Sequence, residues 1–242
     1  MNSRQLYRLL QINGGTFPTG GFSQSWGLET YVAEGIVHDY ESFMGFLENF
    51  MESSIGKCEG PIIRRAWELA GEMTACGTDS GSQIAALTEL EQLSVAVKVT
   101  GESRSASIRM GKAFRRIMEP VIDDDAREKL QNIIAGAKGA GNDILTFPVL
   151  YGIVCRLLEL DVEEAIAAYV FSTVNTLVQS ALKLIPLGNV EAQKAVFASD
   201  ECMDKVLGFC MSIPIEEITN FCPGLDIASL RHETLPVRLY MS

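Results

Sequence analysis

The amino-acid sequence predicts an all-α protein that forms a single-domain bundle of about ten helices. Two observations carry this prediction. Apolar residues recur every three to four positions in nearly every segment, as at Phe43, Phe46, Leu47 and Phe50. No segment shows convincing strand pairing, an internal repeat or low complexity. A chain of 242 residues is also long enough to bury a core without disulfides or a metal.

Local signals place the ends of these helices. Ser3, Asp39 and Asp161 are expected N-caps, Pro61 is expected as a first helical residue, and Pro120 is expected to end a helix. The expected helices span residues 3–10, 43–55, 61–73, 84–97, 103–118, 126–138, 148–160, 162–185, 189–199 and 200–213.

The longest of them, residues 162–185, is apolar on most sides. We expect it to be the central helix around which the others pack. Polar residues interrupt it, including Asn175, Gln179 and Lys183, so a buried helix is favoured over a membrane span.

The composition excludes some functions. The net charge of −11 argues against a sequence-independent nucleic-acid binder, because phosphate neutralisation needs clustered Lys and Arg. The six cysteines form no C-x-x-C pair, which favours free and mostly buried thiols. The N-terminus has no basic start followed by a long apolar run. We therefore expect a cytoplasmic protein.

A glycine-rich loop near the N-terminus, residues 13–29, is the most informative segment. It holds five glycines and Pro18, and its spacing is similar to that of a phosphate-binding loop. However, Gly21 stands where the phosphate-binding Lys is needed and Phe22 where a hydroxyl is needed. We interpret the loop as a turn between two helices, with Gly14 as C-cap and Ser23 as the next N-cap.

Few residues could carry chemistry. His232 opens a sequence similar to H-E-x-x-H, but Pro236 occupies the position of the second ligand. Residues 123–125 are three aspartates, similar to metal–diphosphate motifs, yet the further carboxylate of such motifs is absent. A helical enzyme acting on a diphosphate-type substrate near Asp123–Asp125 stays open as the alternative function. His232 and Cys222 are weak candidates for binding nickel.

Two further segments leave alternatives open. Residues 103–118 carry Arg104, Arg109, Lys112, Arg115 and Arg116, either as a solvated helix face or as a docking surface for an acidic partner. The tail, residues 223–242, ends in apolar and aromatic residues instead of fading into polar ones, so it is expected to dock. It could dock against its own domain or into another protein.

Four motifs, in order along nearly the whole chain, resemble the UreF family of urease accessory proteins. They are the loop Phe17–Glu29, the central Glu102-Ser103-Arg104 with Met110-Gly111, the Pro186-Leu187-Gly188 turn, and residues 226–234 with the ending Arg238–Ser242. The chain departs from the family pattern after Gly188, at Thr146, where many members carry His, and at Pro236-Val237.

The resemblance implies a non-enzymatic, all-helical protein in urease maturation. It implies a homodimer that bridges the accessory protein UreD/UreH and the GTPase UreG while nickel is incorporated into the urease apoprotein. GTP is then bound by the partner, nickel is handled by the complex, and no cofactor is bound stably by this chain. Neither a nucleic acid nor a membrane is an expected partner. The expected partner-binding residues are Pro18, Gly20, Gly21, Phe22, Ser23, Gly27, Glu29, Arg231, His232, Glu233, Arg238, Leu239 and Tyr240.

Overall fold

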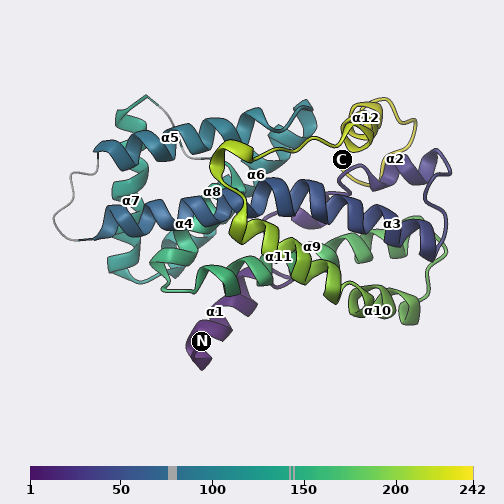
Figure 1. The fold of residues 1–242 in the computed structure, drawn as a ribbon, viewed down its shortest axis with the longest axis horizontal. Coiled ribbons are helices and arrows are strands. Elements are labelled where there is room, and N and C mark those ends of the chain that lie inside the picture. The colour runs from purple at the N-terminus through teal and green to yellow at the C-terminus, as the bar shows by residue number, and fades with distance from the viewer. Residues whose placement is uncertain (76–80, 142, 144, 242) are drawn as a thin grey trace.

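The fold is a bundle of α-helices, seen in a computed structural model that describes residues 1–75, 81–141, 143 and 145–241 (Figure 1). These residues contain no β-strand, so the predicted all-α class is confirmed. The α-helices are α1 (Ser3–Asn13), α2 (Leu28–Ala33), α3 (Tyr40–Phe50), α4 (Gly60–Thr74), α5 (Gly81–Ala96), α6 (Gly101–Val121), α7 (Asp124–Gly139), α8 (Phe147–Leu157), α9 (Val162–Leu184), α10 (Asn189–Ala198), α11 (Asp200–Ser212) and α12 (Pro223–His232). Short helical turns span Gly21–Ser23 and Ile215–Glu217, and a π-helix spans Met51–Glu59.

The core lies where α4, α8 and α9 meet. Nine consecutive residues of α8, from Phe147 to Cys155, are buried, so this helix is covered on every side. Helix α9 packs against α1, α2, α3, α4, α8, α10 and α11, which agrees with the predicted central apolar helix. At 23 residues it is about 34 Å long. Its length and composition would also suit a membrane span, but 56% of its most apolar window is buried inside the fold.

Helices α3 and α4 form one continuous rod through the π-helix, which corrects the prediction of two helices with Pro61 opening the second (Figure 1). In an α-helix, the backbone N–H of residue 61 would donate to the carbonyl of Lys57. Pro61 has no N–H and cannot form this hydrogen bond. The π-helix widens the turn, so that the N–H of Gly60 donates to the carbonyl of Ile55. The free carbonyl of Lys57 accepts instead from the N–H of Thr219, 3.0 Å away. A tertiary contact thus allows a proline inside a continuous helix.

Helix ends follow the predicted caps at Asp39, Asp161 and Gly14. Two predicted N-caps are wrong. Asn2 caps α1 in place of Ser3, because its side chain and that of Gln5 form a reciprocal capping box. The helix after the glycine-rich loop starts beyond Gly27, and Ser23 ends a short helical turn. Pro120 was expected to end α6, but it lies inside the last turn of the helix, which continues to Val121.

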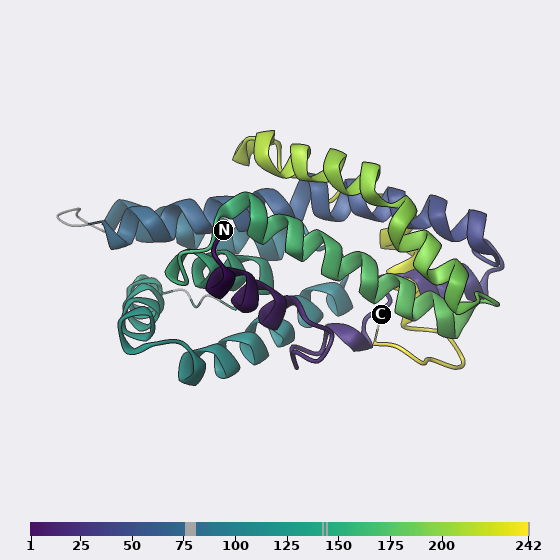
Figure 2. The same cartoon turned by 90° about the horizontal axis from the view of Figure 1, so that it is seen from below.

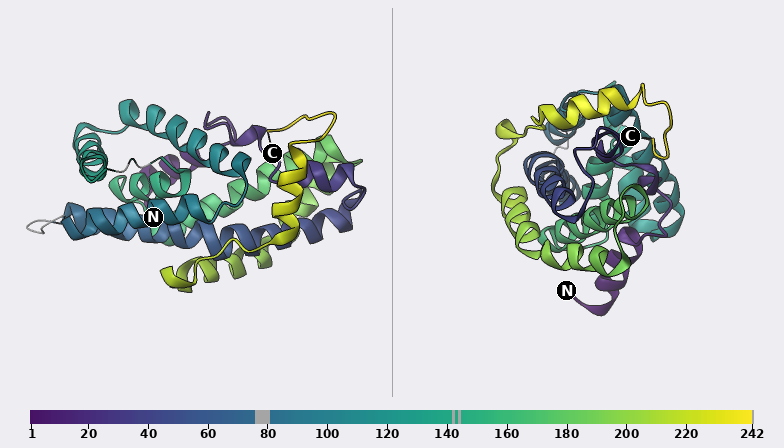
Figure 3. Two further views of the ribbon diagram at one scale, coloured as in Figure 1. Left: turned by 90° about the horizontal axis from the view of Figure 1, so that it is seen from above. Right: turned by 90° about the vertical axis from the view of Figure 1, so that its right-hand side faces the viewer.

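The glycine-rich loop with α2 and the C-terminal segment meet on one side of the bundle. Helix α12 packs against α2. Figures 2 and 3 show the glycine-rich loop, α6 and the C-terminal residues along the same edge of the molecule. This edge brings together three of the four motifs that were singled out in the sequence.

Candidate docking site at the C-terminal tail

A strained turn positions the first side chain of the site, Glu29. Trp26 and Gly27 both have left-handed backbones, with φ of 47° and 88°. A bulky residue rarely adopts this conformation, whereas glycine does so without strain. The Trp26 ring packs on Phe50, with ring centroids 5.7 Å apart, which holds the turn in place. The turn directs Leu28 into the core and leaves the Glu29 side chain buried beside α12.

Helix α12 is fixed to the body by two polar contacts. The hydroxyl of Thr30 donates to the carbonyl of Ala228 at 2.9 Å, in the buried contact between α2 and α12. The hydroxyls of Thr100 and Ser229 lie 2.9 Å apart at the start of α6. Both contacts place the last residue of α12, His232, between α2 and α6.

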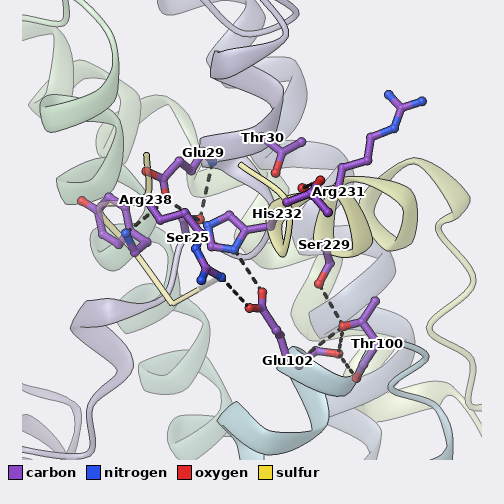
Figure 4. Close-up of polar contacts among 12 residues, drawn as sticks. Ser25, Glu29, Thr30, Thr100, Glu102, Ser229, Arg231, His232 and Arg238 are labelled. Atoms are coloured by element: carbon purple, nitrogen blue, oxygen red, sulfur yellow. Dashed lines mark hydrogen bonds and ion pairs between the residues drawn. The ribbon is translucent and has the colours of Figure 1, made fainter. Parts of the chain in front are cut away.

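The His232 ring is fully buried between two carboxylates (Figure 4). Its Nε2 atom lies 2.9 Å from an oxygen of Glu29, and its Nδ1 atom lies 3.0 Å from an oxygen of Glu102. A carboxylate only accepts hydrogen bonds, and the ring carries a proton on both nitrogens only as imidazolium. One buried ring thus joins α2, α6 and α12 through its two nitrogens.

The same two carboxylates hold the chain beyond α12. Glu29 accepts from the backbone N–H groups of Leu239 at 2.6 Å and Tyr240 at 3.1 Å. Glu102 accepts from the guanidinium of Arg238 at 3.1 Å. The N–H of Met241 donates to the carbonyl of Ser23, in the glycine-rich loop, at 2.8 Å. The last residues are therefore bound to the body by their polar groups.

Three apolar side chains of this segment point outward. Tyr240 is buried, with its ring 5.8 Å from the Lys183 ammonium. Val237, Leu239 and Met241 are 75%, 68% and 45% exposed. We call these three side chains the tail ridge. The tail thus docks on its own domain, one of the two alternatives left by the sequence, while it presents an apolar row to solvent.

The expected partner-binding residues divide into three groups by burial. The buried ones are Gly27, Glu29, His232 and Tyr240, and each lies in the contact between the tail and the body. The exposed ones are Pro18, Gly20, Phe22, Arg231, Glu233, Arg238 and Leu239, while Gly21 and Ser23 are half-buried.

Sequence reasoning missed Glu102 and Thr100 as anchors of the tail. Both lie just before or within the central motif, but neither periodicity nor spacing shows that this helix start faces residues about 130 positions later. Thr146, the departure from the family pattern, is buried and gives its hydroxyl to Glu91 at 2.7 Å. Burial raises the pKa of Glu91, and the hydrogen bonds from Thr146 and Leu145 oppose that rise.

The candidate nickel residues do not converge. His232 has both ring nitrogens occupied by carboxylates. Cys222 precedes the first turn of α12, about 15 Å of helix away from His232. Across the described ranges, no group of three or more His, Cys, Asp or Glu is placed to hold a metal ion.

The three aspartates of the alternative enzyme hypothesis serve the start of α7. Asp123 caps the helix by accepting from Ala126 at 3.0 Å. Asp124 pairs with Arg127, and Asp125 pairs with Lys129 at 2.5 Å. Each carboxylate thus has a partner on its own helix, an arrangement typical of an acidic helix start.

Comparison with known proteins gives the family. The profile of UreF matches residues 37–200, which is 164 of the 242 positions. The chain belongs to the UreF family. The match covers most of the bundle, including Glu102, and leaves out the glycine-rich loop and the tail.

Full-length relatives extend the likeness to those segments. The chain is 30% identical to the "Urease accessory protein UreF" of Bacillus sp. (strain TB-90), over 98% of this chain and 99% of that protein. It is 27% identical to the protein of the same name from Paenarthrobacter aurescens, with both chains fully covered. The relative from Ureaplasma urealyticum serovar 10 is 30% identical over 98% of this chain and 96% of its own length.

Proposed function

We propose that this UreF-family protein is a non-enzymatic scaffold in the maturation of urease. In this proposal it binds the accessory protein UreD/UreH through the tail site and regulates the GTPase UreG, and the assembly incorporates nickel into the urease apoprotein in the cytoplasm. The full-length likeness to proteins named as urease accessory proteins supports the proposal.

The tail ridge is the observation that carries the proposal. A tail that served only to cover its own domain would turn its apolar side chains inward. Here hydrogen bonds to Glu29 and Glu102 hold the inner side, and Val237 and Leu239 are left outside. An ordered apolar row of this kind is a preformed anchor, because the cost of ordering the tail has already been met before a partner arrives.

An apolar groove extends this surface. It lies between α1 and α9, has a volume of about 680 Å³, and is lined by Leu6, Leu10, Phe22 and Phe171 among others. Phe22 and Tyr240 both lie within about 6 Å of the Lys183 ammonium, so the groove and the tail meet at this lysine. We propose that UreD/UreH covers the groove together with the tail ridge.

A second apolar patch supports the proposed homodimer. Helix α10 exposes Phe197 and Val190, whose side chains are 81% and 70% exposed. Large exposed apolar groups that gather on one helix mark interaction sites. We propose that a second copy of the chain covers this patch, which leaves the tail site of each copy open.

The experiment is activation of urease in cells that express the complete set of maturation factors. Deletion of residues 231–242 is expected to abolish nickel-dependent urease activity and the capture of UreD/UreH, while the circular dichroism spectrum stays helical. Val121→Glu, at an exposed apolar residue at the far end of α6, is the control. Full activation by the deletion variant would overturn the proposal.

A further inference from the structure

Helix α6 carries a concentration of positive charge that is unusual for this chain. Residues 103–118 include five Lys or Arg and no Asp or Glu. The rest of the chain holds the other 15 basic residues against all 31 acidic ones, a net charge of −16. The acidic chain thus has one basic segment, on the helix that also carries Glu102 of the tail site.

Two of the five basic side chains have structural partners. Arg104 donates to the carbonyls of Lys98 and Val99 at 2.7 and 2.8 Å, and Arg115 donates to Glu119 at 2.7 Å. The other three are Arg109, Lys112 and Arg116, and all are exposed. Within the described part of the chain, none of these three takes part in a hydrogen bond or ion pair.

The three free cations form one row, which we call the basic stripe. Their spacing of three and four residues places them on the same face of α6, over about 10 Å along the helix axis. The opposite face is buried against α8 through Phe114 and Met118. The stripe therefore faces away from the bundle and can meet a partner without any change in the fold.

The basic stripe begins where the tail ends. Arg109 lines a hollow of about 750 Å³ together with Arg238, Tyr240 and Met241, and the carboxylates of Glu102 and Glu233 line its other part. Figures 2 and 3 show α6 and the tail on the same edge of the molecule. A protein that covers the tail ridge therefore approaches the basic stripe as well.

We propose that the basic stripe is the charged half of the tail docking surface and receives a row of carboxylates from the protein that binds the tail. The inference rests on the proposed function, since it takes the tail ridge to be a partner site. Complementary charge at the edge of an interface mainly sets orientation and association rate. The stripe would align the acidic partner along α6 while the tail ridge supplies the apolar anchor. A nucleic acid is a poorer occupant, because three cations on a chain of net charge −11 neutralise few phosphates.

The test measures the association of purified UreD/UreH with the full chain at increasing salt. The variant Lys112→Glu/Arg116→Glu reverses two charges of the stripe. The matched control, Lys57→Glu/Lys138→Glu, makes the same charge change at exposed lysines on the π-helix and α7. We expect the stripe variant to associate about tenfold or more slowly at low salt and to lose most of the salt dependence of the wild type. The control should behave like the wild type.

Equal association rates for the stripe variant and the control would overturn the inference, and so would a wild-type rate that does not change with salt. The proposed function can fail without the charge effect. It fails if deletion of residues 231–242 leaves the affinity for UreD/UreH unchanged while the stripe variant still associates slowly. Tight binding of a DNA or RNA duplex that the stripe variant loses would assign the stripe to nucleic acid and also contradict the inference.

Discussion

The imidazole of His232 is hydrogen-bonded to the carboxylate of Glu29 across 2.9 Å, although 203 positions separate the two residues. This contact joins the turn after the glycine-rich loop to the end of α12. The same carboxylate binds the N–H groups of Leu239 and Tyr240, so one buried side chain holds both the helix and the tail that follows it.

Glu29→Gln should release the tail. The amide removes the charge that faces His232 and replaces one acceptor oxygen with a donor, so the free energy of unfolding should fall by about 3 kcal/mol. Amide hydrogen exchange at Leu239 and Tyr240 should become much faster. Glu34→Gln is the control, because Glu34 pairs with the exposed Arg231 and such pairs contribute less than about 1 kcal/mol. Slow exchange at both amides in Glu29→Gln would show that Glu29 does not hold the tail.

Gly111→Ala should damage the fold. At Gly111, α6 packs closely against the segment that leads into α8. A Cβ atom there would lie 1.9 Å from the carbonyl oxygen of Leu145, so a backbone segment must move. We expect a loss of about 3 kcal/mol, in the range of severe overpacking. Gly101→Ala, in the same helix with no neighbour within 4 Å of the added atom, should leave stability nearly unchanged. Equal melting temperatures of the two variants would refute the close crossing.

The buried ion pair between Lys98 and Glu59 should show strong coupling. The ammonium lies 2.5 Å from the carboxylate, which also accepts from the hydroxyl of Tyr169. Burial is the largest single effect and lowers the pKa of Lys98. The charges of Glu59 and Cys58 and the hydrogen bond to Glu59 together outweigh burial, so the net pKa is raised and the ammonium stays charged at neutral pH. Lys98→Met should cost about 3 kcal/mol, because it leaves the mostly buried carboxylate of Glu59 without its counter-ion.

The double variant Lys98→Met/Glu59→Gln should recover part of this loss in urea unfolding. The exposed pair Lys205–Glu52 provides the comparison, since its removal should cost less than about 1 kcal/mol. Strictly additive effects at Lys98 and Glu59 would rule out the coupling.

The buried cysteines predict a loss of stability at high pH. Burial raises the pKa of Cys58 and of Cys210 from 9.0 to about 12. Because the pKa of each thiol is higher in the folded than in the unfolded chain, its contribution to the free energy of unfolding is complete below pH 9. That contribution is lost as the pH rises toward 12. At pH 10 each thiol should account for a loss of about 1.4 kcal/mol.

Alkylation of the folded protein should therefore modify the partly exposed Cys222 well before Cys58 or Cys210, as mapped by mass spectrometry. Rapid modification of Cys58 at pH 8 would contradict its burial. The predicted free thiols are confirmed for five cysteines, and Cys76 lies outside the described residues.

The sequence predicted the class of the fold and most helices, because a 3.6-residue period and caps such as Asp39 and Asp161 are local signals. It failed at Pro61, where a hydrogen bond from Thr219 to Lys57 permits a continuous helix. The site shows the same limit. The glycine-rich loop and the tail were both singled out, but their contact through Glu29 and His232 depends on tertiary packing that no local pattern contains.

The affinity of UreD/UreH for the variant Val237→Glu/Leu239→Glu tests the central claim most directly. These side chains are exposed, so the variant should fold and keep its tail on the body, as shown by slow exchange at Tyr240. The account predicts an affinity at least about 100-fold weaker than that of the wild type, because two apolar anchors are replaced by charges. Wild-type affinity in this variant would contradict the claim that the tail ridge is the partner-binding surface.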